Sequence, residues 1–314
     1  MGVDRVASLP MYDFPELRDA HNALWGALAA RLVVAGVRDV PPELTHDVGH
    51  RDVWHDPSLL FAQGCEYPLA KSFADRVRLV ATPMYSAAGC EGARYRSALV
   101  VRSWGEGGPH DPSAGGAARY SGDRGAVCDA DNDARAAGAA GVAGEPGRTF
   151  ARLADFRGRR CVINELDSNS GMNLLRAAVA PLASGGRFFG SVVVSGSHLR
   201  SVQMVASGEA DIACVDCVSF AHFQRLYPLV VAELRVLSWT ASSPSLPFIS
   251  SCSSSDATVQ ALRSALADVF DDDGLAAVRE RLLLSGVDLR PTEGFGEVLA
   301  LERGAVDRGY PTVW

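Results

Sequence analysis

Short apolar runs alternate with longer amphipathic stretches along most of the chain. Residues 17–36 (LRDAHNALWGALAARLVVAG) carry apolar side chains about every 3.6 positions and close at Gly36, which predicts an amphipathic helix. The runs VRLVATPMY (77–85) and SALVVRS (97–103) have the length and the β-branched content of strands.

The second half repeats this alternation. Four further segments have strand patterns: RRCVIN (159–164), GSVVVSGS (190–197), ADIACVD (210–216) and AELRVLSWT (232–240). Three have helical patterns: MNLLRAAV (172–179), HLRSVQMVASG (198–208) and DATVQALRSALADVF (256–270). Strands that alternate with helices in this way predict an α/β fold.

Polar and aromatic side chains collect where the predicted strands end. Five strand ends carry them, at Tyr12, Tyr85, residues 165–171, His198 and Asp216. In open α/β sheets, ligands bind in the crevice beyond the carboxyl ends of the strands. The sequence therefore predicts one binding crevice to which several strand ends contribute.

The segment DSNSG (167–171) lies between a predicted strand and a predicted helix, with Glu165 just before it. The first amides of a helix have no intrahelical partners and carry partial positive charge. A turn rich in Ser and Gly at this position is either an ordinary helix cap or a seat for an anion. These residues alone leave both readings open.

Composition narrows the class of function. Of 314 residues, 47% are hydrophobic and 21% are charged, a balance typical of globular proteins. The net charge of −7, without a long basic cluster, disfavours a nucleic-acid partner. No apolar run approaches the roughly 18 residues of a membrane span. The first residues lack the pattern of a signal peptide, so the sequence does not predict export.

The seven cysteines are scattered and odd in number, which favours a reducing compartment over a disulfide framework. Cys214 and Cys217 form a CxxC, but Cys214 lies in a buried strand pattern. A redox pair instead needs an exposed first cysteine at a helix start. Because zinc-ligand spacing and cofactor motifs are also missing from the sequence, we expect neither a metal nor a cofactor.

Residues 105–148 differ in composition from the rest of the chain. Half of them are Gly or Ala, and Val127 and Val142 are the only large aliphatic residues. Such a stretch buries too little apolar surface to offset its chain entropy. We therefore expect a disordered insertion at 104–148.

Several segments, taken in order, resemble the phosphonate/phosphate-type (PhnD-like) substrate-binding proteins of ABC transporters. They are SLPMYDFP, FAQGCEYPL, ATPMY, YRSALVVRS, LADFRGRRCVINELDSNSGMNLLRAAVAP, VVVSGSHLRSVQMVASGEADIACVD, LRVLSWTASSPSLPFIS and GYPTVW. The resemblance covers nearly the whole chain except residues 105–148.

This resemblance implies the type II periplasmic-binding-protein fold, in which two α/β lobes hold a ligand between them. By similarity, residues 1–103 and 241–314 form the first lobe, and residues 149–240 form the second. The chain would cross between the lobes near Ser103 and near Trp239–Thr240.

The resemblance also implies a set of ligand-binding residues. By position they are Tyr12, Tyr67, Tyr85, Glu165, Ser168, Asn169, Ser170, Gly171, His198 and Asp216. The serine-rich turn and the histidine would hold the anion, and Asp216 would face a cationic part of the ligand. Tyr12 and Tyr67 would close the pocket from the first lobe, with Tyr85 and Tyr95 as further candidates.

One departure from the family bears on the ligand. The family turn is Ser-Thr-Ser-Gly-like, whereas this turn begins with Asp167 and follows Glu165. Unless they are offset, these charges would repel a dianion, at a cost on the order of a kcal/mol per exposed pair. A zwitterion such as an aminoalkylphosphonate would instead bring an ammonium group to the carboxylates.

The sequence thus predicts a solute-binding protein that captures a small phosphonate- or phosphate-like oxyanion by hinge closure, for an ABC permease. Two alternatives stay open, a cytosolic sensor and an enzyme built on the same fold. GxSxG, HExxH, Walker and GxGxxG motifs are absent from the sequence, which disfavours catalysis. The compartment also stays open, because the resemblance implies the periplasm while the free cysteines favour the cytoplasm.

Overall fold

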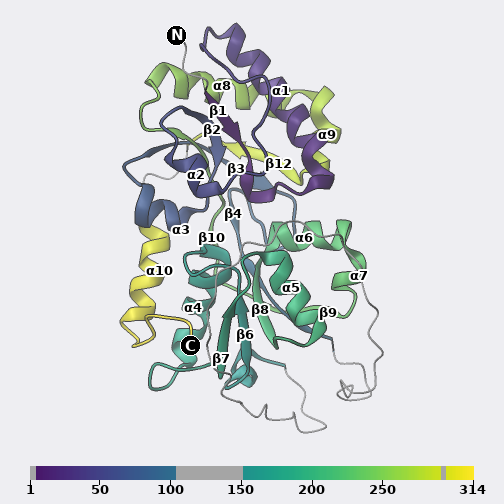
Figure 1. Ribbon diagram of the computed structural model, residues 1–314, viewed down its shortest axis with the longest axis vertical. Helices are drawn as coiled ribbons and strands as arrows, with labels where there is room; N and C mark the ends of the chain where they lie inside the picture. The colour runs from purple at the N-terminus through teal and green to yellow at the C-terminus, as the bar shows by residue number, and fades with distance from the viewer. Residues whose placement is uncertain (1–4, 104–150, 291–294) are drawn as a thin grey trace, which may run out of the picture.

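The computed structural model describes residues 5–103, 151–290 and 295–314. They form two α/β lobes that follow one another along the long axis of the molecule (Figure 1). The insertion expected at 104–148 lies wholly outside the described residues.

The first lobe is built on a five-stranded sheet. In hydrogen-bonded order its strands are β1 (Val6–Ser8), β2 (Leu59–Gln63), β11 (Phe248–Ser251), β3 (Val77–Tyr85) and β12 (Leu284–Asp288). Its helices are α1 (Arg18–Val34), α2 (His50–His55), α3 (Glu66–Pro68), α8 (Asp256–Asp271) and α9 (Ala276–Arg281). Short helical turns are η1 (Pro10–Tyr12), η2 (Pro15–Leu17), η3 (Leu69–Phe73) and η7 (Asp273–Leu275).

Helix α1 confirms the helix predicted from its period. Leu24, Leu28 and Leu32 are at most 1% exposed and belong to the core of the first lobe. Burial of each such side chain contributes about 1.5–3 kcal/mol. The helix stops before Gly36, whose φ of 79° lies in the left-handed region that favours glycine.

The second lobe has its own five-stranded sheet. In order its strands are β7 (Ser191–Val194), β6 (Arg160–Ile163), β8 (Ile212–Asp216), β5 (Ser97–Arg102) and β9 (Leu234–Trp239). Its helices are α4 (Leu174–Val179), α5 (His198–Ser207), α6 (Cys217–Leu226) and α7 (Pro228–Val231), and its short turns are η4 (Leu153–Phe156), η5 (Asn169–Asn173) and η6 (Ala180–Leu182). Because β6, β7 and β8 are parallel, their carboxyl ends meet at one edge of the sheet.

The chain passes between the lobes through two short strands, β4 (Arg94–Tyr95) and β10 (Ser243–Pro244), which pair with each other between the sheets (Figure 1). Strand β5 follows β4 and belongs to the second sheet. The first crossing therefore lies at β4 and not near Ser103, where the family resemblance placed it. The apolar pattern of β5 marks a strand but carries no information on which sheet receives it.

The C-terminal residues also depart from the expected division. Helix α10 (Gly296–Val306) packs against α4, and Val298 and Tyr310 belong to the same apolar cluster as Ile163 of the second sheet. The segment 295–314 thus packs mainly on the second lobe, although residues 241–314 as a whole were expected in the first. Glu302 of α10 also forms an ion pair with Lys71 of the first lobe at 3.1 Å, so α10 touches both lobes.

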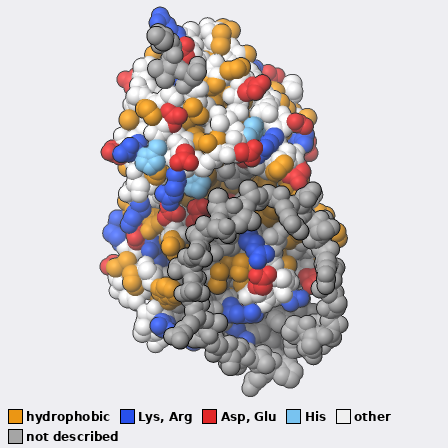
Figure 2. Space-filling view, in the orientation of Figure 1, with side chains coloured by type: hydrophobic (Ala, Val, Ile, Leu, Met, Phe, Trp, Pro, Cys, Tyr) orange, Lys and Arg blue, Asp and Glu red, His pale blue; other side chains and the backbone are white. Residues whose placement is uncertain are grey.

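The surface agrees with the charge pattern of the sequence. Acidic and basic side chains are intermixed on the face shown in Figure 2. Among the described residues, no helix is long and apolar enough to cross a membrane. The two lobes, joined by two crossing strands, form the type II periplasmic-binding-protein fold.

Candidate functional site

A cavity of about 230 Å³ lies between the two lobes. The first lobe contributes residues of η1 and α2 and the two residues at either end of α3, Cys65 and Pro68, while the second contributes the three strand ends after β6, β7 and β8. The side chains and backbone that line it are Pro10, Met11, Tyr12, Phe14, His50, Cys65, Pro68, Asn164, Glu165, Asp167, Ser168, Ser170, Gly196, Ser197, His198, Leu199, Asp216, Ser219, Phe223 and Leu246.

The DSNSG segment is both a helix cap and a wall of this cavity. Ser168 caps η5, since its Oγ accepts a hydrogen bond from the Gly171 amide at 3.0 Å. Gly171 packs so closely against Asn164 that an added Cβ would overlap the Asn164 Oδ1 atom. Glycine is therefore required here by space. The cap expected from the sequence is present, and Ser168 and Ser170 also line the cavity, which is where an anion seat would have to lie.

A row of hydrogen-bonding groups runs along this wall. The Ser168 and Ser170 hydroxyl oxygens lie 3.3 Å apart, and the Ser170 Oγ lies 2.9 Å from His198 Nε2. Burial lowers the pKa of His198 to about 4, so its imidazole is neutral near pH 7. Its Nδ1 is buried and has no hydrogen-bond partner among the described residues. The row can therefore donate hydrogen bonds to a ligand without adding a full positive charge.

Asp216 joins the two lobes at the floor of the cavity. Its Oδ1 accepts a hydrogen bond from the Ser219 amide at 2.8 Å and thereby caps α6. The Tyr12 hydroxyl, from the first lobe, lies 3.1 and 3.2 Å from the two carboxylate oxygens. Burial raises the pKa of Asp216 to about 6, although the hydrogen bonds from Ser219 and Tyr12 lower it. Within the described ranges, no cationic side chain forms an ion pair with Asp216.

The negative charges of Glu165 and Asp167 are partly neutralised by residues of the first lobe. Arg51 of α2 forms an ion pair with Asp167, and His50 Nε2 lies 3.8 Å from a Glu165 carboxylate oxygen. Burial lowers the pKa of His50, while Glu165 acts in the opposite direction. These contacts reduce the repulsion of an anion that the sequence predicted. They also join the two lobes beside the cavity, because α2 and the end of β6 belong to different lobes.

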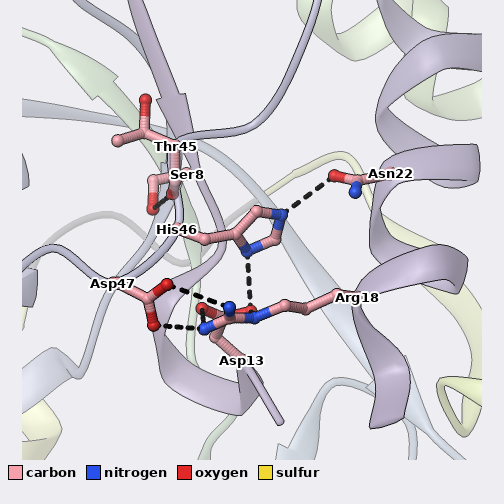
Figure 3. A network of polar contacts seen from close by, with 7 residues as sticks. All are labelled: Ser8, Asp13, Arg18, Asn22, Thr45, His46 and Asp47. Atoms are coloured by element: carbon pink, nitrogen blue, oxygen red, sulfur yellow. Dashed lines mark hydrogen bonds and ion pairs between the residues drawn. The ribbon is translucent and has the colours of Figure 1, made fainter. Parts of the chain in front are cut away.

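A polar network holds η1, and with it Tyr12, in place (Figure 3). Asp13 accepts hydrogen bonds from Arg18 Nε at 3.2 Å and contacts His46 Nδ1 at 2.7 Å. Arg18 also donates to Asp47 at 2.9 Å, and His46 Nε2 lies 2.9 Å from the side-chain oxygen of Asn22. Asp13, the residue after Tyr12, is thus held both by Arg18 of α1 and by His46, which lies 33 positions further along the chain.

Four of the predicted ligand-binding residues do not line the cavity. Tyr67 accepts a hydrogen bond from Arg176 at 3.2 Å, and Gln63 donates to the Tyr85 hydroxyl at 2.8 Å. The side chain of Asn169 is buried, and the Gly171 amide donates its hydrogen bond to the Ser168 hydroxyl oxygen.

Tyr95, the further candidate, lies in β4 and accepts a hydrogen bond from Asn169 at 3.1 Å. The other six predicted residues, Tyr12, Glu165, Ser168, Ser170, His198 and Asp216, do line the cavity.

Sequence reasoning missed much of the wall. An apolar group, Met11, Phe14, Leu199, Phe223 and Leu246, lines the cavity together with Asn164, His50 and Ser219. Phe14 and Phe223 come from different lobes and pack edge to face with ring centroids 5.7 Å apart. Asn164 directly follows β6, so the strand-end rule could have found it. The aromatic contact could not be found, because it depends on how the lobes meet.

Two lobes and an interlobe cavity that carries a hydrogen-bonding row define this protein as a ligand-binding protein of the two-lobed class. The family profile for the periplasmic phosphonate-binding proteins of ABC transporters matches residues 58–289, and the chain belongs to this family. A search of curated proteins found no match to the sequence.

Solved structures share the fold at low sequence identity. The XAC2383 protein from Xanthomonas citri, bound to chloride, is 12% identical with a TM-score of 0.64, over 98% of this chain and 99% of that one. PhnD1 from Prochlorococcus marinus, in complex with methylphosphonate, is 10% identical with a TM-score of 0.63, over 97% and 98% of the two chains. A binding component of an ABC phosphonate transporter from Pseudomonas aeruginosa is 13% identical with a TM-score of 0.63, over 98% and 88%.

Proposed function

We propose that this protein captures a small phosphonate-like oxyanion in its interlobe cavity and presents it to an ABC permease. The observation that carries the proposal is the row formed by Ser168, Ser170 and His198, at a helix start inside a cavity shared by two lobes. A tetrahedral oxyanion has several lone pairs, and hydroxyl and imidazole groups can each donate to one of them. Family membership and the methylphosphonate complex of the Prochlorococcus neighbour support this class of ligand.

The same row supports binding in preference to catalysis. Ser170 and His198 lie at the distance of a nucleophile and its base. A catalytic histidine is normally oriented by a third group, whereas His198 Nδ1 lacks a hydrogen-bond partner within the described residues. His198 is thus placed to hydrogen-bond Ser170 but lacks the group that would orient it as a general base. Hinge closure over the cavity then accounts for function without a reaction step.

Asp216 favours a ligand that also carries an ammonium group. Of the three cavity carboxylates, Glu165 and Asp167 face cationic or ionisable partners, whereas Asp216 has only neutral donors among the described residues. A buried carboxylate gains most from a cation when its surroundings supply none. An aminoalkylphosphonate would place its phosphonate on the serine row and its ammonium beside Asp216. The apolar wall would then contact the carbon linker.

Titration calorimetry with inorganic phosphate, an alkylphosphonate and the aminoalkylphosphonate of equal chain length tests the proposal. We expect Ser170→Ala to weaken both phosphonates by about 10- to 150-fold, because a hydrogen bond to a charged group is worth about 1.5–3 kcal/mol. Ser207→Ala is the matched control, since Ser207 is exposed at the far end of α5. Wild-type affinity in Ser170→Ala would reduce DSNSG to a helix cap.

The transport role needs a separate measurement. Ligand-dependent binding to an ABC permease in detergent or nanodiscs is the expected result for a transport protein. Ligand-dependent binding to a regulator instead would support the sensor alternative. Conversion of the bound phosphonate, followed by phosphorus NMR, would support an enzyme on this fold.

A further inference from the structure

Two cysteine side chains meet across the lobes beside the ligand cavity. The Cys90 and Cys217 Sγ atoms lie 3.4 Å apart, and both residues are free thiols. Cys90 lies in the loop between β3 of the first sheet and the crossing strand β4. Cys217 is the first residue of α6 in the second lobe and directly follows Asp216.

The loop that carries Cys90 is fixed to both lobes. The Ser86 amide donates to the Leu283 carbonyl at 2.8 Å, which ties the loop to the first lobe. Gly89, with φ of 99°, lies so close to α6 that an added Cβ would be 3.2 Å from the Cys217 Cβ and 2.8 Å from the Trp239 ring. The two thiols are therefore held face to face by packing on both sides.

The cysteines of the CxxC point to different partners. Cys214 is buried in β8 and donates to the Ser170 carbonyl at 3.0 Å. The partner of Cys217 is the remote Cys90, which is partly exposed and can be reached by an oxidant. The prediction from the sequence that Cys214 is a packing residue agrees with its burial. That reading could not extend to Cys217, because its contact depends on a residue far away in the chain.

We propose that Cys90 and Cys217 are the site of a reversible disulfide that ties the first lobe to the second. The Cys90 thiolate attacks a small-molecule disulfide, such as oxidised glutathione, which gives a mixed disulfide and releases one thiolate. The Cys217 thiolate then attacks the Cys90 sulfur, and the second thiolate leaves. Two thiols are oxidised by two electrons, the disulfide reagent is reduced to two thiols, and the two cysteine protons pass to the leaving thiolates.

The geometry requires only a small movement. A disulfide needs sulfur atoms about 2.05 Å apart, so the loop must close by on the order of an ångström from the observed 3.4 Å. Cys90, burial and the neighbouring Asp216 raise the pKa of Cys217, which lowers its thiolate fraction at neutral pH. The second step therefore accelerates with rising pH.

The disulfide would restrain hinge motion close to the ligand. Asp216, which the Tyr12 hydroxyl contacts from the first lobe, precedes Cys217 in the chain. A covalent link at this point holds the lobes in the arrangement that keeps Tyr12 on Asp216. Oxidation would then slow opening of the cavity.

The experiment uses the purified full chain, titrated with glutathione redox buffers at pH 7 and pH 8.5, then alkylated and analysed by peptide mass spectrometry. We expect a peptide pair linked through Cys90 and Cys217 that forms faster at pH 8.5. We also expect a melting temperature several degrees higher, which a reductant reverses. Cys90→Ser should abolish both effects, whereas the exposed-site control Cys252→Ser should retain them.

Three results would overturn the proposal. The first is that Cys90 and Cys217 stay unlinked while Cys252 reacts. The second is that Cys90 pairs with another cysteine. The third is that the link forms but the melting temperature does not rise. That result would mean that the disulfide does not hold the two lobes together in their native arrangement.

Discussion

Replacing Asp216 by asparagine should make the protein more stable and a poorer binder at the same time. Burial raises the pKa of this carboxyl from its ordinary 3.8 to about 6. Each pKa unit corresponds to about 1.36 kcal/mol, so keeping this group ionised in the folded state costs about 3 kcal/mol. The protonated carboxyl does not carry this cost. The stability associated with protonation of Asp216 is therefore fully present below pH 3.8 and is lost as the pH rises through about 6.

The Asp216→Asn side chain removes the charge and keeps the shape. Its carbonyl oxygen can still accept from the Ser219 amide and from Tyr12, which now contact the carboxylate. A neutral cap is weaker than a charged one, so part of the gain is lost. We expect the variant to exceed the wild type by about 1–3 kcal/mol at pH 8, with a much smaller advantage near pH 4.

Binding should change in the opposite direction. Loss of one partner from a buried charge pair costs about 2–5 kcal/mol, so the affinity for an aminoalkylphosphonate should fall by about 30- to 4,000-fold. The alkylphosphonate of equal length should bind the variant and the wild type alike. This residue would then be retained for its ligand at the expense of stability.

Urea unfolding of both proteins at pH values from 4 to 8 measures the first effect, and calorimetry with the two phosphonates measures the second. The difference between the proteins at each pH isolates Asp216, because other titrating groups are common to both. A variant less stable than the wild type at pH 8 would refute the burial argument. Equal losses of affinity for both phosphonates would remove the ammonium site and leave the anion seat intact.

Two further predictions concern the packing around the site. Gly171→Ala should destabilise the protein by about 1–3 kcal/mol and weaken ligand binding, because the added methyl group must displace Asn164; thermal melts and calorimetry measure both, and a wild-type melt would contradict the overlap. Burial lowers the pKa of His21, His198 and His222 to about 4, so stability present above pH 6.5 should be lost as the pH falls through about 4. Histidine NMR titrations follow each ring, and pKa values near 6.5 in the folded protein would contradict their burial.

Local patterns were enough to predict the helices α1, α5 and α8 and the strands β5 to β9, but not β2, β12 or α10. The period of α1, the strand runs and the glycine stops depend on neighbouring residues, so a single sequence contains them. The placement of β5 and of residues 295–314 depends on which lobe buries them, and periodicity cannot decide that. The family resemblance supplied the two-lobed arrangement, which the periodicity alone did not.

The candidate site divides in the same way. The second-lobe side chains, from Ser168 to Asp216, lie at strand ends and follow from the rule for α/β sheets. Tyr12 came from the same rule in the first lobe. The contacts of His50 and Arg51 with acidic residues of the second lobe could not be predicted, because they join helices and loops more than a hundred positions apart. The partial neutralisation of Glu165 and Asp167, which reduces their repulsion of an anion, could therefore be recognised only from the structure.

Asn169, the middle residue of DSNSG, links the cavity wall to the crossing strands. Ser168 and Ser170 face the cavity, whereas the Asn169 amide nitrogen donates to the Tyr95 hydroxyl at 3.1 Å and to Ser243 Oγ at 2.9 Å. Tyr95 and Ser243 form a register pair of β4 and β10, the two strands through which the lobes are joined. A shift of the turn that carries Ser168 and Ser170 would therefore be passed to the crossing strands through the side chain of Asn169. Under the proposed function, a ligand held by Ser168 and Ser170 would therefore act on the crossing strands through Asn169, and binding would favour one arrangement of the two lobes over the other.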